Sequence, residues 1–240
     1  CDSMAWHIVN SRRKIGDIEK GWESEKRLSS LKIKYVDPSA SPFEAKLQQR
    51  ALERLSTAYV QEEFDWIIEG RAITTLEDYL STPRLGRGVP FQQRTRKVVW
   101  GLYQQYSKAS TKERFQSIRQ EALALVTSDE SIERFDYVLV DEAQDLSPVA
   151  LSLMAELCET PEGLFFAADN KQSLYSRNYS WSSANPRLQF KGRSRTLRKN
   201  YRSTREIDHA AFSVLHPDEG EELQESQSIH QGPLPVLVRD

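Results

Sequence analysis

Two adjacent carboxylates, Asp141 and Glu142, directly follow the apolar run Tyr137-Val138-Leu139-Val140. In open α/β sheets, ligands bind beyond the carboxyl ends of the strands. A carboxylate at that place can bind Mg²⁺ against the phosphates of a nucleotide, while its neighbour orients and deprotonates the attacking water. Acidic pairs also end many strands without any chemical role. Taken alone, the pair therefore favours a plain polar strand terminus.

A second chemical signal is a run of basic residues between positions 176 and 205, in which neither Asp nor Glu occurs. Its nine basic residues are Arg177, Arg187, Lys191, Arg193, Arg195, Arg198, Lys199, Arg202 and Arg205, and the aromatic residues Tyr175, Tyr179, Trp181 and Phe190 lie among or beside them. Basic groups along a phosphate backbone, with aromatic faces that stack bases at roughly 1–3 kcal/mol each, are what sequence-tolerant single-strand binding requires. For any single member, a solvated charge or a core aromatic remains the favoured interpretation.

The elements that position these residues form an alternating pattern from residue 135 onward, which predicts an α/β domain built on a parallel sheet. The run 137–140 is continuous enough for a strand buried on both faces. A helix follows, with Ser147 as its N-cap and Pro148 at its first position. A second strand covers 163–168 and ends at Asp169. We further expect an extended piece at 196–202, a helix capped by Ser203 and ended by His216-Pro217, an acidic loop at 217–225 and a strand at 236–238.

The first half, residues 1 to about 130, has helical signals instead. Ser41, Pro42 and Glu44 together form a capping box with a proline at the first position. Apolar residues then recur every fourth position, which predicts one long helix with a single apolar stripe formed by Phe43, Leu47, Ala51, Leu55 and Tyr59. Further helices are expected from Thr74, from Pro90 and along Phe115, Ile118, Ala122 and Leu125. These stripes are typical of core packing and indicate no cofactor.

Composition narrows the class of protein. With 240 residues, 38% of them apolar, the chain is long enough for a substantial core. No run approaches the roughly 18 apolar residues of a membrane span, and the start lacks the pattern of a secretory signal, so we expect a cytoplasmic protein without a membrane partner. Two distant cysteines and four scattered histidines predict neither a disulfide framework nor a His/Cys metal site.

Three ordered segments resemble motifs of the UvrD/Rep-type superfamily 1 DNA helicases. Asp141-Glu142-Ala143-Gln144-Asp145 resembles motif II, the Walker B element. Ala168-Asp169-Asn170-Lys171-Gln172-Ser173-Leu174-Tyr175 resembles motif III at the expected distance, and Asn200-Tyr201-Arg202-Ser203-Thr204 resembles motif IV. The motifs cover residues 135 to about 210, and a looser similarity from about 60 to 134 includes segments 76–80 and 86–88. The resemblance of the longer string to motif II therefore favours a role in a nucleotide site for the Asp141-Glu142 pair over a plain polar strand terminus.

The resemblance implies an α/β fold: a partial RecA-like P-loop NTPase lobe with a parallel sheet and an all-α helical insertion. Its parts are residues 1–130 (helical insertion subdomain of the first motor lobe), 131–215 (RecA-like half-lobe with motifs II, III and IV) and 216–240 (acidic loop and start of the second lobe). It also implies an ATP-dependent helicase or translocase that uses ATP and Mg²⁺. The partners that the resemblance implies are single-stranded DNA or a duplex–single-strand junction, together with the remainder of the same helicase chain.

The resemblance implies a role for each matched position. Asp141 is expected to bind Mg²⁺ and Glu142 to be the general base for water attack. Gln172 is expected to sense the γ-phosphate, Tyr201 to stack on the adenine and Arg202 to reach the γ-phosphate. The residue types agree with these roles, since an aromatic face suits a planar base and a bidentate cation suits developing phosphoryl charge. Without motif II upstream, the preferred interpretation of Tyr201 and Arg202 is a packed aromatic and a surface ion pair.

Departures from the family pattern leave alternatives open. Ala168 replaces the usual glycine, and Arg177-Asn178 stands where many relatives have Trp-Arg, so the stacking aromatic is Tyr175, Tyr179 or Trp181. The candidate DNA contacts are Tyr175, Arg177, Tyr179, Trp181, Arg193 and Arg195. No G-x-x-x-x-G-K-[ST] phosphate loop occurs. We therefore expect an internal segment of a longer helicase, inactive by itself. The alternative is a non-catalytic DNA-binding or interaction module derived from a decayed helicase.

Overall fold

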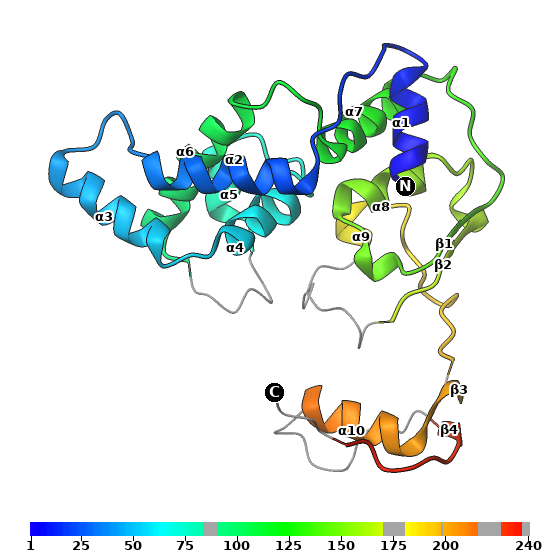
Figure 1. Cartoon of the computed structure of the whole chain (residues 1–240). Coiled ribbons are helices and arrows are strands. Elements are labelled where there is room, and N and C mark those ends of the chain that lie inside the picture. The colour runs from blue at the N-terminus through cyan, green and yellow to red at the C-terminus, as the bar shows by residue number, and fades with distance from the viewer. Residues whose placement is uncertain (84–90, 170–180, 198, 216–226, 237–240) are drawn as a thin grey trace. The chain divides into compact units, whose positions relative to one another are not determined.

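The computed structural model describes residues 1–83, 91–169, 181–197, 199–215 and 227–236 (Figure 1). By packing, the chain divides into two units, Cys1–Gln189 and Phe190–Asp240. Each unit is described by itself below. In the described part of the chain, no helix combines the length and the apolar content that crossing a lipid bilayer requires.

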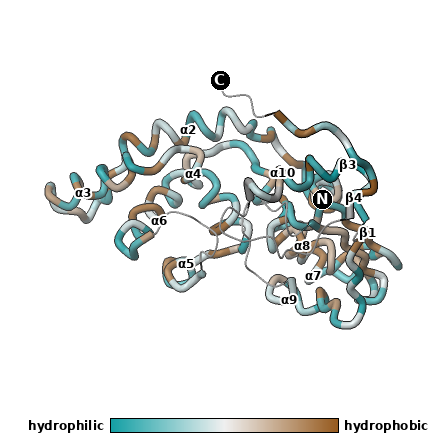
Figure 2. The backbone as a smooth tube through the Cα atoms, turned by 90° about the horizontal axis from the view of Figure 1, so that it is seen from below, coloured by the Kyte–Doolittle hydropathy of each residue, from teal (hydrophilic) through white to brown (hydrophobic). Residues whose placement is uncertain are grey.

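Helices dominate the first 130 residues, as the sequence predicts. They are α1 (Asp2–Asn10), α2 (Gly21–Lys34), α3 (Pro42–Glu53), α4 (Thr57–Glu62), the π-helix η1 (Glu63–Ile68), α5 (Leu76–Ser81), α6 (Gln93–Lys108) and α7 (Phe115–Ser128). A core of buried apolar residues joins α2 through α6, and its fully buried members include Leu28, Leu52, Phe64, Tyr79, Leu102 and Tyr106. Figure 2 shows the alternation of hydrophobic and hydrophilic residues along these helices.

The predicted long helix from Phe43 to Tyr59 is wrong, because the chain forms two helices there. Ser41 and Glu44 do form the expected capping box at the start of α3. Ser56 then caps α4, with its side chain accepting a hydrogen bond from the backbone N–H of Tyr59 at 3.1 Å. An apolar repeat of four residues drifts by about 40° per step around a helix of 3.6 residues per turn, so a single face cannot hold it. Accordingly Phe43 is 72% exposed, whereas Leu55 is buried.

Other predicted helix starts shift by small amounts. The cap of α5 is Thr75 rather than Thr74, since the Thr75 side chain accepts from the backbone N–H of Asp78 at 3.1 Å. The helix α6 begins at Gln93, and Pro90 lies outside the described residues. The predicted helix along Phe115 to Leu125 is confirmed as α7.

Buried polar contacts tie the helical region to α7. The carboxylate of Glu69, which directly follows η1, pairs with the guanidinium of Arg114, and their side chains are only 3% and 12% exposed. In addition, Gln120 of α7 donates from Nε2 to the backbone carbonyl of Glu69 at 2.6 Å. The helix α7 packs against α1 on one side and against α8 (Pro148–Glu156) on another. This chain of contacts links the helical region to the strands that follow.

Two parallel strands, β1 (Val138–Val140) and β2 (Leu164–Phe166), lie in register with Leu139 opposite Phe165. The short 3-10 turns η2 (Ala143–Asp145) and η3 (Pro161–Gly163) lie between them in sequence, on either side of α8, and the helix α9 (Trp181–Ala184) comes later. Every residue of α8 from Val149 to Ala155 is buried, and α8 packs against β1. This fits the expected mixed α/β class with a parallel pairing.

The expectation that the first strand is buried on both faces is wrong for this chain. Leu139 and Phe165 are 74% and 62% exposed, whereas Val140 and Leu164 are buried. Side chains alternate along a strand, so the paired Leu139 and Phe165 share one face and Val140 lies on the other. In the described residues only the face toward α8 is covered, and the apolar sequence of the strand could not reveal this.

The second unit contains β3 (Lys199–Thr204), α10 (Arg205–Leu215) and β4 (Gln227–His230). β3 and β4 pair in parallel, and α10 packs against both. β4 was not predicted, because its sequence Gln-Ser-Ile-His has no apolar run. The predicted strand at 236–238 reaches beyond the described residues, and the described Val236 belongs to no strand. The expected acidic loop at 217–225 and the helix end at His216-Pro217 also lie outside the described residues.

Candidate active site around Asp141 and Glu142

The segment Asp141–Asp145 begins where β1 ends. Backbone hydrogen bonds extend the β1–β2 pairing past the strand ends: Ala167 donates to the carbonyl of Val140 at 2.8 Å, and Ala143 donates to the carbonyl of Ala167 at 2.9 Å. The segment is therefore anchored to the chain that leaves β2. Both Asp141 and Glu142 are exposed to solvent at this carboxyl end of the sheet.

Glu142 has an unusual backbone conformation. Its φ of 50° and ψ of 40° place it in the left-handed region, which residues other than glycine rarely adopt. Its backbone N–H donates to Oδ1 of Asp141 at 2.9 Å, so the two acidic residues form one local turn. Uncommon backbone conformations of this kind cluster at functional sites.

Gln144 connects this turn to the end of the neighbouring strand. Its side chain is nearly buried, at 9% exposure. The amide Nε2 donates to Oε2 of Glu142 at 2.5 Å, and the amide Oε1 accepts from the backbone N–H of Asp169 at 3.0 Å. Gln144 lies within the segment that resembles motif II, but the sequence alone predicts no role for it. The spacing of two residues from Glu142 was the available signal, whereas the link to Asp169 arises from the pairing of the strands.

The helix α8 holds the other end of the segment. Ser147 is its N-cap, as predicted, and its side chain accepts from the backbone N–H of Ala150 at 3.3 Å. The N–H of Val149 donates to the carbonyl of Gly70 at 2.9 Å. A methyl group on Gly70 would lie 2.8 Å from two backbone carbonyl oxygens and 3.1 Å from Cβ of Ser147, so only glycine fits between η1 and α8.

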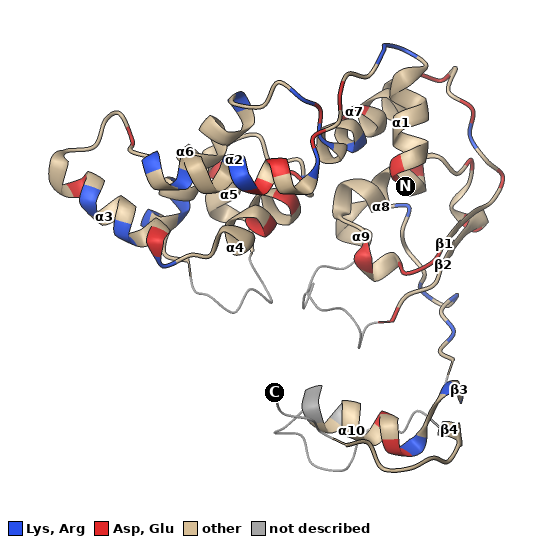
Figure 3. Cartoon of the chain, viewed as in Figure 1, with Lys and Arg blue, Asp and Glu red and all other residues tan. Residues whose placement is uncertain are grey.

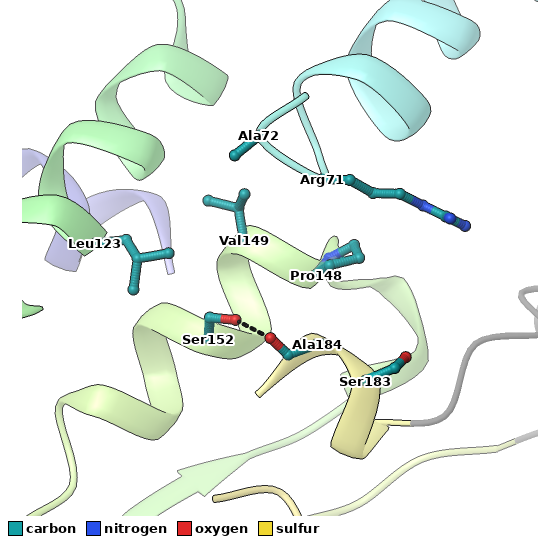
Figure 4. A pocket seen from close by; sticks show the side chains of 8 residues that line it. All are labelled: Arg71, Ala72, Leu123, Pro148, Val149, Ser152, Ser183 and Ala184. Carbon is teal, nitrogen blue, oxygen red and sulfur yellow. Dashed lines mark hydrogen bonds between the residues drawn. The ribbon is translucent and has the colours of Figure 1, made fainter. Parts of the chain in front are cut away.

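A small hollow lies beside α8 (Figure 4). Its volume is about 290 Å³, and Leu123, Pro148 and Val149 are among its lining residues. Ser152 donates to the carbonyl of Ala184 at 2.9 Å along its edge. No residue of the 141–145 segment lines it. We therefore place the candidate site at the exposed strand ends and not in this hollow.

The motif III positions are only partly described. Ala168 and Asp169 follow β2, but Gln172, Tyr175, Arg177 and Tyr179 lie outside the described residues. Trp181 begins α9, is partly exposed, and contacts the ring of Phe166 edge-on at a centroid distance of 5.5 Å. Of the three candidate stacking aromatics, Trp181 alone falls within the described residues.

The motif IV segment forms β3 and the start of α10 in the second unit. Asn200 organises it: Oδ1 accepts from the backbone N–H of Arg202 at 2.8 Å and of Ser203 at 3.2 Å, and Nδ2 donates to the carboxylate of Asp208 at 2.9 Å. Tyr201 is 67% exposed, and Arg202 is exposed. An anchored asparagine thus presents these two side chains to solvent.

The family assignment follows from comparison with known proteins. The family model described as "UvrD/REP helicase N-terminal domain" matches residues 13–193, which include the helices α2 to α7, both strands of the first sheet and the acidic turn. This chain belongs to the UvrD/REP helicase family. It is also similar to the protein named "Putative ATP-dependent DNA helicase YjcD" of Bacillus subtilis (strain 168), with 28% identity over 144 residues, which are 53% of this chain and 18% of that protein. The chain thus spans less than a fifth of the length of the curated relative that it matches.

Within this UvrD/REP family chain, the exposed carboxylate of Asp141 fits a ligand of Mg²⁺, and Glu142 lies beside it. Mg²⁺ prefers oxygen ligands and keeps several waters, so one or two carboxylates and the phosphates of a nucleotide suffice. Asp141 and Glu142 are exposed and adjacent, and Gln144 already donates to one oxygen of Glu142. Among the described residues, no group of three or more His, Cys, Asp or Glu side chains is arranged to hold a metal ion. The described residues therefore offer an ion at this place at most two side-chain ligands of these types.

Some members of the basic run donate to backbone carbonyls of the chain itself. Arg187 donates to the carbonyl of Glu159 at 2.9 Å and lies 3.8 Å from the carboxylate of Glu156, and Arg205 donates to the carbonyl of Ser228 at 3.1 Å. Arg193 and Arg195 are exposed, and the guanidinium of Arg193 lies over the ring of Phe190 at 5.6 Å. Figure 3 shows Lys and Arg, without Asp or Glu, along the segment that leads into β3.

Proposed function

We propose that this chain is a segment of an ATP-dependent DNA helicase that moves along single-stranded DNA and contributes residues for Mg²⁺-ATP hydrolysis. The observation that carries the proposal is the turn that Asp141 and Glu142 form at the end of β1. The side chain of Gln144 links the Glu142 carboxylate in this turn to the backbone of Asp169. Membership of the UvrD/REP helicase family supports it. A plain polar strand terminus would explain neither the left-handed backbone of Glu142 nor its buried partner.

The proposed chemistry divides between the two carboxylates. Asp141 contributes an oxygen ligand to Mg²⁺. When bound, this ion neutralises part of the negative charge of the nucleotide phosphates. Glu142 orients the attacking water and accepts its proton as the general base. The short contact from Gln144 occupies Oε2 of Glu142 and leaves Oε1 for water. Orientation matters because phosphoryl transfer depends almost entirely on positioning and electrostatics.

The remaining motif residues take the roles that the family resemblance implies. In this proposal Gln172 senses the γ-phosphate, while Tyr201 stacks on the adenine and Arg202 contacts the γ-phosphate. The exposure of Tyr201 and Arg202 supports their availability to a ligand. For DNA, the exposed Arg193 and Arg195 contact the phosphate backbone and Trp181 offers a ring for base stacking.

The direct test is Glu142→Gln in a full-length helicase that contains this chain. The substitution removes the base but keeps the size of the side chain and the neighbouring Asp141. We expect DNA-stimulated ATP turnover to fall by roughly 10²–10⁴-fold while ATP binding persists. Glu130→Gln makes the same chemical change at an exposed position between α7 and β1, and should leave turnover unchanged. A Glu142 variant that keeps more than about a tenth of the activity rules out the general base.

The 240-residue chain alone should release no phosphate from Mg²⁺-ATP, with or without single-stranded DNA. Its sequence has no phosphate loop, so the backbone amides and the lysine that position the γ-phosphate are not among its residues. Phosphate release is measured with the purified chain, and Glu142→Gln serves as the contamination control. DNA-stimulated turnover that disappears in that variant would show that another part of this chain binds the phosphates.

A further inference from the structure

We propose that Gln144 is a positioning residue, which sets the orientation of the Glu142 carboxylate according to the position of the chain at Asp169. This inference deepens the proposed function and rests on it. It assigns a role in coupling to a side chain that neither the motif resemblance nor its residue type had marked.

The geometry uses both ends of one amide group. Nε2 donates to Oε2 of Glu142 at 2.5 Å, and Oε1 accepts from the backbone N–H of Asp169 at 3.0 Å. Because the amide is planar, the two contacts constrain each other: if Asp169 shifts, the amide must rotate or give up one partner. The side chain is nearly buried, so water does not readily replace a lost contact.

The residue type follows from these two contacts. A carboxylate can only accept, and a backbone N–H can only donate, so the residue between them must donate at one end and accept at the other. Glutamine meets both demands, whereas a leucine meets neither. A glutamate at this position would face Glu142 with a second negative charge. The contact to Asp169 is made through the backbone, so the link depends on where the chain lies and not on the Asp169 side chain.

The functional consequence is a connection between the water-activating group and the segment that Asp169 opens. Gln172, the proposed γ-phosphate sensor, follows three residues later in the sequence. Both Glu142, with its left-handed backbone, and Asp169 lie at the carboxyl ends of paired strands. We infer that Glu142 is held in its working orientation only while Asp169 occupies the position seen here.

The first test measures the link in the 240-residue chain without any activity. Backbone amide hydrogen exchange is followed for Asp169 in the parent chain, in Gln144→Leu and in Gln104→Leu, a control at an exposed position of α6. We expect faster exchange of the Asp169 amide in Gln144→Leu, with Ala143 and Ala167 amides unchanged because their bonds belong to the strand pairing. Unchanged protection of Asp169 in the Gln144 variant would overturn the proposal.

The second test measures turnover in the full-length helicase with Gln144→Glu, which is nearly the same size. We expect kcat to fall by about 10- to 100-fold, the effect of misplacing a catalytic group by roughly 1 Å, while the KM for ATP stays within about twofold. Gln104→Glu makes the same change on the surface and should behave as wild type. Equal losses in both variants, or a loss confined to KM, contradict a positioning role.

The comparison of kcat with KM separates positioning from a general packing defect, because a misplaced catalytic group lowers kcat while the KM for ATP stays nearly unchanged. If Glu142→Gln retains turnover, the proposed function fails instead, so the two failures are distinguishable.

Discussion

A methyl group at Gly163 tests the packing that holds β2 against β1. Gly163 directly precedes β2, and a Cβ atom there would lie 2.0 Å from the carbonyl oxygen of Asp136 and 2.9 Å from Sγ of Cys158. Contacts below 3.0 Å essentially do not occur for real Cβ atoms. Gly163→Ala must therefore displace the backbone of Asp136, two residues before β1, by about 1 Å.

The magnitude follows from what that displacement disturbs. Overpacking of a well-packed site costs about 1–3 kcal/mol. The adjacent Phe135 donates to the carbonyl of Leu157 at 2.8 Å and accepts from Glu159 at 2.9 Å, and weakening these bonds adds roughly 0.5–1.5 kcal/mol each. Alanine also lowers the conformational entropy of the unfolded chain relative to glycine, and this offsets about 0.4–1 kcal/mol of the destabilisation. Together these terms give a net loss of about 1–5 kcal/mol, and the central value of about 3 kcal/mol corresponds to a Tm lower by roughly 6–12 °C for a unit of this size.

The assay is thermal unfolding of the 240-residue chain, followed by far-ultraviolet circular dichroism. Gly21→Ala is the matched control, because no atom lies within 4 Å of its added methyl group at the first position of α2. Its Tm should not fall. The double variant Gly163→Ala with Cys158→Ala relieves the contact with sulfur alone and should recover little. A Gly163 variant whose Tm stays within about 1 °C of the parent would refute the predicted strand packing.

Two further predictions concern charge. Burial raises the pKa of Asp65. When a group has a higher pKa in the folded protein than in the unfolded chain, the folded protein becomes less stable as the pH rises through that range. Asp65→Asn should therefore gain stability relative to the parent chain between about pH 4 and pH 7, measured by urea unfolding, and a difference that does not change with pH contradicts the assignment. Charge reversal at both Arg193 and Arg195 should weaken single-stranded DNA binding and reduce the salt slope by about 0.7 per lost phosphate contact, measured by fluorescence anisotropy. Unchanged affinity and slope would show that these arginines do not contact DNA.

Local features of the fold were readable from the sequence because the groups that make them are close neighbours. Ser41 caps α3 and Ser147 caps α8 as predicted, since each cap depends on a hydroxyl and a backbone N–H three residues later. The strand before Asp141 and the parallel pairing with the strand before Asp169 were likewise expected from short apolar runs. Motif order sufficed to assign the UvrD/REP helicase family, which the match over residues 13–193 confirms.

Features that depend on distant segments were not readable. The fourth-residue apolar repeat predicts a single helix and does not reveal the break between α3 and α4. The exposure of Leu139 and Phe165 is not predictable either, because an apolar strand does not show what covers each of its faces. Arg187 counted as a basic residue of the presumed DNA-binding run, yet it donates to the carbonyl of Glu159. Sequence composition does not distinguish a basic side chain that faces solvent from one that donates a hydrogen bond to a backbone carbonyl.

The amino-acid sequence shows that two carboxylates follow a strand, and its motifs indicate a helicase family. How one of these carboxylates is held depends on the packing of distant segments. Gln144 and Asp169 are 25 residues apart, and they meet because β1 and β2 pair in parallel and end at the same edge. Hydrogen bonds within a turn depend on a few consecutive residues, whereas a bond between two strand ends depends on register, which is set by the packing of the whole unit.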